Sequence, residues 1–216
     1  MKHHFFAYVS RLRYIRRWGL MRSVMPENDA EHSLQVAMIA HAIAIMGRDR
    51  YGRQVDPEHV LALGVYHDVS EVITGDMPTP VKYQTDELRR SYKDVERMAN
   101  ERLLSMLPEG LRPAYAPYLS VPADEERQIL KAADSISAYL KCLEEKRAGN
   151  REFDAAGQSI RRGLEEIELP EVGPDDVQIK GLCKVGKAIM ESNQVPAGQL
   201  LQLAMSVSGQ FFQLLL

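Results

Sequence analysis

Four residues in this chain have the side chains and the spacing of a metal site. His67 and Asp68 are adjacent, His32 lies in an earlier apolar segment, and Asp134 lies in a later one. Two imidazoles with two carboxylates suit Mn²⁺, Co²⁺, Fe²⁺, Ni²⁺ or Zn²⁺ better than Ca²⁺. Such an ion lowers the pKa of its water and can bind a phosphoryl oxygen. The four residues therefore predict a hydrolytic centre with a divalent transition metal, and the choice of ion stays open.

Each of these residues also has an ordinary structural interpretation. A histidine such as His32, near a helix N-terminus, often packs or caps, and a pair such as His67-Asp68 can simply end a helix. Asp134 lies among apolar residues in mid-helix, where an unpaired carboxylate would be costly, so it needs a partner that could be an arginine. The metal site is favoured because all of them occur together on apolar helices able to converge.

Two further features fit a hydrolase. Glu71 follows His67 and Asp68 by about one helical turn, so we expect it to point into the same pocket and carry protons there. Its alternative is an exposed glutamate at a helix end. The adjacent Arg17 and Trp18 combine a guanidinium for bidentate phosphate contact with a flat apolar wall for a sugar or base. Taken alone, a tryptophan is more often a core residue.

Helices must position these side chains, because helical periodicity recurs along the chain and strand-like alternation is nearly absent. The chain is therefore predicted to be all-α. The expected helices cover about residues 4–16, 28–46, 56–73, 86–106, 124–147 and 153–168.

The second of these helices is expected to be central. Asn28 and Glu31 resemble a capping box at its start, with His32 in the first turn. Apolar residues occur on both of its sides, and Leu34 and Met38 belong to one of them. A helix that is apolar on both sides is predicted to be a central one.

The third helix should carry the His-Asp pair. Asp56-Pro57 is a strong helix start, and the pattern continues to about Ile73 before Gly75 ends it. The segment 76–80 that follows contains two prolines, so it is predicted to be an irregular loop beside the pair.

Size and composition predict one ordinary domain. The chain has 216 residues, 45% hydrophobic residues and a net charge of -3 from interspersed acids and bases. No basic face indicates polymeric nucleic acid, and no segment indicates a signal peptide or a membrane span. Cys142 and Cys183 lack a CxxC spacing, which favours reduced thiols and a cytoplasmic protein.

These residues, in this order, resemble the HD-domain metal-dependent phosphohydrolases. Within that superfamily the chain resembles the bacterial 5'-deoxynucleotidases of the YfbR family over about residues 1–168. The segments that carry the narrower resemblance are Arg17-Trp18 and residues 31–37, 66–72, 74–83, 131–134 and 138–145.

The resemblance implies an HD-domain helical bundle with a metal site between central helices. It implies hydrolysis of deoxyribonucleoside 5'-monophosphates with little choice among bases, a homodimer, and a metal such as Co²⁺ or Mn²⁺. By matching position, the expected metal ligands are His32, His67, Asp68 and Asp134. The expected substrate contacts are Arg17, Trp18, His32, Asp68, Asp76, Met77, Pro78, Thr79 and Asp134. The expected catalytic residues are Glu71, Asp76 and Arg17, and Trp18 is expected to crowd the 2' position of the sugar.

Residues 169–216 depart from the family pattern and are expected to form a divergent segment packed on the same domain. Two alternative functions remain open. One keeps the fold and changes the substrate, giving a pyrophosphohydrolase or a phosphodiesterase for a signalling nucleotide. A diesterase often needs a second metal, and no spare His-Asp ligands are found. The other is a nucleotide-binding protein without turnover, for which a broken ligand set would be expected.

Overall fold

The computed structural model describes residues 4–82, 84–167 and 169–172, and within these ranges it contains helices and no strand. The prediction of an all-α fold is confirmed. The α-helices are α1 Phe5–Val9, α2 Asp29–Tyr51, α3 Pro57–Tyr66, α4 Glu71–Thr74, α5 Thr79–Lys82, α6 Asp86–Ser105, α7 Arg112–Tyr115, α8 Asp124–Arg147 and α9 Asp154–Glu165. Short 3₁₀ turns cover Ser10–Tyr14, Glu109–Leu111, Ala116–Leu119, Arg151–Phe153 and Pro170–Val172. Among the described helices, none combines the length and hydropathy that crossing a bilayer requires.

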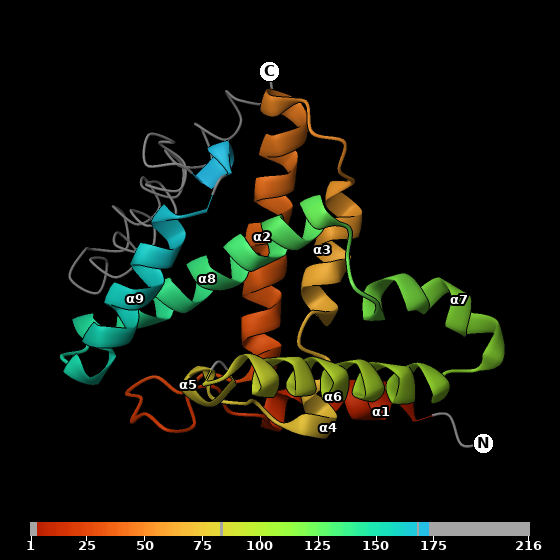
Figure 1. Ribbon diagram of the computed structural model, residues 1–216, viewed down its shortest axis with the longest axis horizontal. Helices are drawn as coiled ribbons and strands as arrows, with labels where there is room; N and C mark the ends of the chain where they lie inside the picture. The colour runs from red at the N-terminus through yellow and green to blue at the C-terminus, as the bar shows by residue number, and fades with distance from the viewer. Residues whose placement is uncertain (1–3, 83, 168, 173–216) are drawn as a thin grey trace, which may run out of the picture. The chain divides into compact units, whose positions relative to one another are not determined.

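Helix α2 runs through the middle of the bundle, with α3 along one side and α8 crossing it (Figure 1). The Asn28 side chain caps its start by accepting from the backbone N–H groups of Ala30 and Glu31. The helix passes the predicted end at Met46 and stops at Gly52, whose φ of 69° is a conformation that glycine adopts readily.

Helix α2 is central as predicted, but its apolar side with Leu34 and Met38 is only partly covered. Val36 and Ile43 are fully buried, whereas Leu34 and Met38 are 58% and 55% exposed. The helices α3 and α8 that pack on α2 cover the side with His32, so the opposite apolar side meets solvent within the described part of the chain.

The contact between α2 and α3 depends on a glycine. A Cβ atom on Gly64 would lie 2.6 Å from the Cα atom of Ala37, closer than real atoms approach. The absence of a side chain at Gly64 therefore lets the helices that carry His32 and His67 come together.

The His-Asp pair lies in a turn rather than inside a helix. Asp56 caps α3 as predicted, but the helix ends at Tyr66, a turn follows, and α4 begins at Glu71. The predicted continuous helix to Ile73 is therefore wrong. The turn allows Val69 and Val72 to pack into the core, and a straight helix would direct these two side chains elsewhere.

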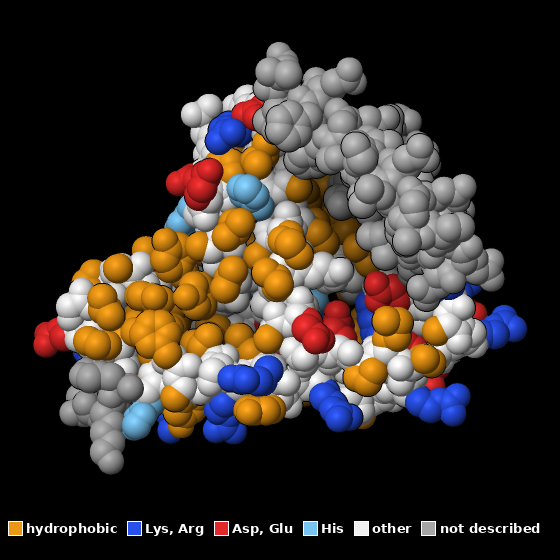
Figure 2. All heavy atoms as spheres, turned by 180° about the vertical axis from the view of Figure 1, so that it is seen from behind, with side chains coloured by type: hydrophobic (Ala, Val, Ile, Leu, Met, Phe, Trp, Pro, Cys, Tyr) orange, Lys and Arg blue, Asp and Glu red, His pale blue; other side chains and the backbone are white. Residues whose placement is uncertain are grey.

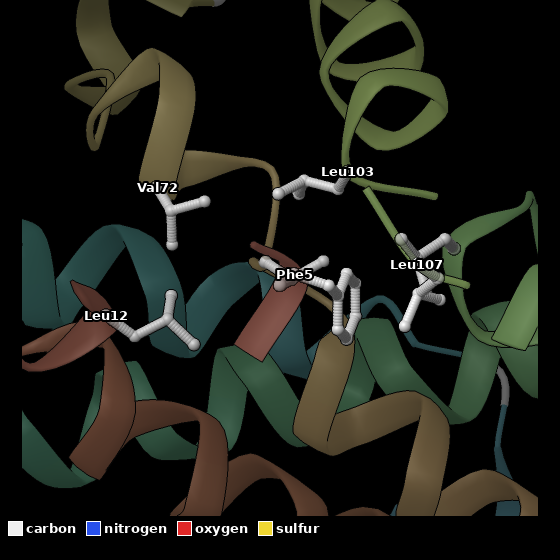
Figure 3. Packing of buried hydrophobic residues seen from close by; sticks show 7 residues of the cluster. Phe5, Leu12, Val72, Leu103 and Leu107 are labelled. Atoms are coloured by element: carbon white, nitrogen blue, oxygen red, sulfur yellow. The ribbon is translucent and has the colours of Figure 1, made fainter. Parts of the chain in front are cut away.

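These two valines, Val69 and Val72, belong to a core cluster that gathers residues from distant parts of the chain (Figure 3). The buried members of the cluster are Phe5, Leu12, Val69, Val72, Leu103, Leu107 and Leu119. This packing anchors the turn immediately after Asp68, so the cluster holds the His-Asp pair in place.

The first predicted helix is shorter than expected. Helix α1 ends at Val9, a 3₁₀ turn continues to Tyr14, and Arg16 pairs with Asn28 in an antiparallel bridge. The backbone N–H of Arg17 donates to the carbonyl of Glu27 over 3.1 Å. These contacts close residues 17–27 into a loop, which we call the Trp18 loop.

The remaining helices follow the sequence pattern closely. Helix α6 ends one residue before the predicted Met106, and α8 has the predicted bounds. The loop 76–80 is partly regular, because Thr79 starts the single helical turn α5 and a proline is tolerated in a first turn. Helix α9 ends at Glu165, short of the predicted residue 168.

The described chain continues to pack on the bundle just after residue 168. Leu169 is buried, and Tyr51 of α2 donates from its hydroxyl to the carbonyl of Pro170. The contacts within the chain define a compact unit that extends to residue 174. The expectation for most of the segment 169–216, and for Cys183, lies outside the described residues.

Candidate active site

One nitrogen or oxygen atom from each of His32, His67 and Asp68 lies within 4.8 Å of the other two, close enough to hold a metal ion. The Nε2 atom of His67 is 2.9 Å from Oδ2 of Asp68, and the Nε2 atom of His32 is 3.7 Å from the same oxygen. His32 comes from the first turn of α2, and the other two residues follow α3. The structure thus brings together three of the four predicted ligands.

Hydrogen bonds at the far side of each ring determine which nitrogen can bind a metal. Nδ1 of His67 is 2.8 Å from the carbonyl of Gly64, which can only accept, so this nitrogen carries the proton. Nδ1 of His32 is 3.1 Å from the hydroxyl of Ser137, which itself donates to Oε1 of Gln35. Both imidazoles therefore direct Nε2 toward Asp68, as the ring nitrogen available to a metal.

These Nε2 atoms are buried and make no oriented hydrogen bond with any described residue. Burial alone would lower the pKa of His67, but the charges of Asp68 and Asp134 outweigh it and raise that pKa to about 9. The carboxylates thus favour a positive charge next to Nε2 of His67. The donor set of two imidazole nitrogens and a carboxylate fits a divalent transition metal.

Asp134 lies beside this group rather than within it. Its Oδ1 atom is 3.1 Å from Nε2 of His32, and its side chain is 46% exposed. Burial would raise the pKa of Asp134, but the adjacent imidazole lowers it. The carboxylate in mid-α8 therefore has the partner that the sequence required, and its role as the fourth ligand stays a prediction.

Arg17 lies next to the candidate ligands. Its Nη1 atom is 3.1 Å from Oδ2 of Asp68, and its Nη2 atom is 4.0 Å from Oδ1 of Asp134. Burial would lower the pKa of Arg17, but the surrounding carboxylates, including Glu27 and Asp76, outweigh it and raise that pKa. A permanent positive charge therefore faces the space beside the three ligands.

A cavity of about 1070 Å³ opens beside these groups. Its lining includes Arg17, Trp18, Asp76, Pro78, Thr79 and Asp134, together with one face of α8 and α9. Met77 is absent from the lining, so the structure gives its predicted substrate contact no support. Trp18 is only half-buried, as suits a wall residue more than a core residue.

Glu71 is buried, and the prediction that it points into the same pocket is not borne out, because it does not line this cavity. Asp29, whose charge contributes to the pKa shift of Glu71, is also fully buried. Burial, followed by the charges of Asp68 and Asp29, raises the pKa of Glu71 to about 11. Burial beside these negative charges therefore holds Glu71 in its acid form.

Sequence reasoning missed three residues that organise the site. Ser137 lies three residues after Asp134, on the same face of α8, so helical spacing could have revealed it. Glu27 and Asp29 lie before His32 in no recognisable motif. Only the folded chain brings them to Arg17. Oε2 of Glu27 lies 3.5 Å from Nε of Arg17, and Oδ1 of Asp29 lies 3.8 Å from its Nη1.

The fold resembles that of HD-domain phosphohydrolases. A crystal structure of an HD-domain phosphohydrolase from Listeria innocua matches with a TM-score of 0.72 and 25% identity, covering 96% of this chain and 98% of that one. The HD phosphohydrolase DatZ of cyanophage S-2L matches with a TM-score of 0.56 and 21% identity, over 86% and 96% of the two chains. Helices α2, α3 and α8 and the His-Asp site they carry thus define an HD-domain phosphohydrolase.

Sequence comparison identifies one family within the HD-domain phosphohydrolases. The family model described as 5'-deoxynucleotidase YfbR-like matches residues 4–174. A 5'-deoxynucleotidase of Vibrio atlanticus is 50% identical over 171 residues, which are 78% of this chain and 88% of that protein. The 5'-deoxynucleotidase YfbR of Escherichia coli is 50% identical over 164 residues, 75% of this chain and 82% of that protein. The chain belongs to the YfbR-like 5'-deoxynucleotidase family, and the resemblance found in its sequence is confirmed.

Proposed function

We propose that this protein is a metal-dependent phosphomonoesterase that hydrolyses deoxyribonucleoside 5'-monophosphates to deoxyribonucleosides and phosphate. The observation that carries the proposal is the convergence of His32, His67 and Asp68 on one position, with the Arg17 guanidinium 3.1 Å from the Asp68 carboxylate. The relatives that share half of the aligned sequence are 5'-deoxynucleotidases, which supports the same substrate class here.

His32, His67 and Asp68 would hold the metal, and Asp134 would complete the set. A divalent ion there supplies Lewis acidity toward a phosphoryl oxygen and makes water more acidic. The cyanophage relative is described with one catalytic Zn²⁺ ion, which supports a single metal but does not identify it for this chain. Co²⁺ and Mn²⁺ remain our first candidates.

Arg17 would bind the phosphoryl oxygens. Its guanidinium is 15% exposed and lines the cavity, so it can contact a ligand while its carboxylate neighbours keep it oriented. Because charge on the phosphoryl oxygens changes as the ester bond breaks, a preorganised cation beside them stabilises the transition state.

Glu71 and Asp76 would support proton transfer. Burial raises the pKa of Asp76, which lines the cavity and faces Arg17, so it can hold a proton near the leaving oxygen. Glu71 is not part of the cavity lining, so it would act through water. Its acid form suits a donor better than a base.

Trp18 would favour deoxyribose. The indole forms part of the cavity wall beside Arg17, where a flat ring can crowd the 2' position of a sugar whose phosphate the guanidinium binds. Pro78 and Thr79 also line the cavity and would contact the nucleotide.

The decisive experiment measures phosphate release from a panel of deoxy and ribo monophosphates after chelation, with and without Co²⁺, Mn²⁺ or Mg²⁺. Asp68→Ala should lose both metal and activity, and Arg17→Ala should lose turnover while retaining metal. Asp49→Ala is the matched control, because this aspartate is 52% exposed and pairs only with its neighbour Arg48 among the described contacts. An Asp68→Ala protein with normal metal content and activity would contradict the assignment.

We further propose that the protein is a cytoplasmic homodimer, as the family resemblance implies. Hydrophobic side chains are widely exposed on the face shown in Figure 2, and Leu34 and Met38 of α2 are more than half exposed. Such surface is common where a second subunit packs. Light scattering during gel filtration tests this, and a monomeric mass at micromolar concentration would refute it.

A further inference from the structure

One carboxylate in the Trp18 loop contacts three parts of the candidate site. Oε2 of Glu27 accepts from the indole N–H of Trp18 over 2.8 Å and lies 3.5 Å from Nε of Arg17. Its other oxygen is 3.9 Å from Nδ1 of His32. With a side chain only 12% exposed, Glu27 lies behind the residues that face the cavity and does not line it.

The backbone of Trp18 adopts a conformation that needs support. Its φ of 59° is the only positive value among the described non-glycine residues, and a bulky side chain rarely adopts it. Such a conformation persists when several contacts determine it together. Here the contacts are the indole hydrogen bond to Glu27 and the packing of the ring on Phe153, with centroids 5.1 Å apart.

Glu27 is itself well fixed. It lies at the neck of the loop, where its carbonyl accepts from the N–H of Arg17, and the next residue, Asn28, caps α2. Its side chain is therefore held by the start of α2 rather than by the more exposed tip of the loop around Val24. The orientation of the indole is thereby linked to the helix that carries His32.

We propose that Glu27 is a positioning residue that fixes the indole plane of Trp18 and thereby sets the preference for deoxyribose over ribose. This inference rests on the sugar-selecting role of Trp18 in the proposed function. Without the carboxylate, the indole keeps its contact with Phe153 but loses the bond that stops it from turning about its side-chain torsions. The Trp18 indole can then turn away from the 2' position of the sugar, and a ribose fits more easily.

The test compares Glu27→Ala with Glu27→Gln, because glutamine retains an oxygen that can accept from the indole. Glu27→Ala should reduce the ratio of kcat/KM for dAMP over AMP by about tenfold, the change expected when one hydrogen bond to a charged group is lost. Glu27→Gln should recover most of that ratio. Glu152→Ala is the matched control, because Glu152 binds the same loop through the N–H of Arg22 without contacting Trp18.

A second readout does not depend on turnover. Trp18 is the only tryptophan in the chain, so intrinsic fluorescence reports directly on its indole. Glu27→Ala should shift the emission to longer wavelength and increase quenching by acrylamide, while Glu27→Gln and Glu152→Ala resemble the unmodified protein. Metal content should be the same in all three variants.

The outcomes separate this inference from the proposed function. If the unmodified enzyme prefers dAMP and Glu27→Ala leaves both the preference and the fluorescence unchanged, the role of Glu27 is refuted and the role of Trp18 stands. If the unmodified enzyme hydrolyses AMP and dAMP equally, the sugar-selecting role of Trp18 fails, and the inference fails with it.

Discussion

Replacing Glu145 with alanine should strongly destabilise this protein, although the residue lies outside the candidate site. The Glu145 side chain is fully buried in α8, one turn after Lys141, whose Nζ atom donates to it over 2.6 Å. The carboxylate also accepts from the backbone N–H groups of Val24 and Met25, at 2.8 Å and 3.0 Å, and from the amide of Asn150 at 2.8 Å. It therefore anchors the tip of the Trp18 loop to α8.

The expected loss follows from what the substitution leaves behind. Lys141 would keep a buried charge without its carboxylate partner, and the donors of Val24 and Asn150 would lose this acceptor. Breaking a buried ion pair from one side typically costs about 3–5 kcal/mol. For a domain of this size that corresponds to a fall in Tm of roughly 6–20 °C.

The assay is equilibrium unfolding in urea with thermal unfolding as a second measure. The control is Glu165→Ala in α9, because Arg161 and Glu165 have the same spacing and order but are 66% and 61% exposed. An exposed pair of this kind contributes about 0–1 kcal/mol. Equal free-energy losses for Glu145→Ala and Glu165→Ala would refute the argument from burial.

The other predictions concern acid, helix packing and metal. Burial would raise the pKa of Glu145, but its hydrogen bonds lower it from 4.5 to about 2, so the stability it contributes is present above pH 4.5 and is lost toward pH 2. Glu145→Gln should flatten that part of the pH dependence of unfolding, and an unchanged slope would count against it. Gly64→Ala should lower both Tm and metal affinity, because the new Cβ would lie 2.6 Å from the Cα atom of Ala37 and would push α2 away from α3. The control is Gly163→Ala, whose Cβ meets no atom within 4 Å and should lower neither Tm nor metal affinity. Chelation should abolish activity, and added divalent ion should restore the unmodified protein but not His67→Ala, so recovery by that variant would exclude His67 as a ligand.

Much of the fold was accessible from local pattern. The bounds of α6 and α8 came out almost as predicted because both helices are long and regularly amphipathic. The end of α3 did not, because Val69 and Val72 are buried by residues such as Phe5 and Leu103 that are distant in the sequence. A continuous helical pattern there cannot reveal that the core requires a turn.

The candidate site was likewise predictable from the sequence only in part. Residue types and spacing were enough to single out His32, His67 and Asp68, and the structure brings their ligand atoms within 4.8 Å. The prediction for Glu71 depended on helix geometry alone; the structure buries this residue and leaves it out of the cavity lining, so its catalytic role stays a prediction.

The sequence by itself determined the chemistry available to this protein, the helices that carry it and the family to which it belongs, since side-chain types and helical periodicity are local properties. Only the tertiary structure decided which nitrogen of each histidine is free, which carboxyl holds a proton, and that Glu27 contacts Trp18 and Arg17. Those properties depend on burial and on contacts between segments far apart in the chain, and no local pattern encodes them.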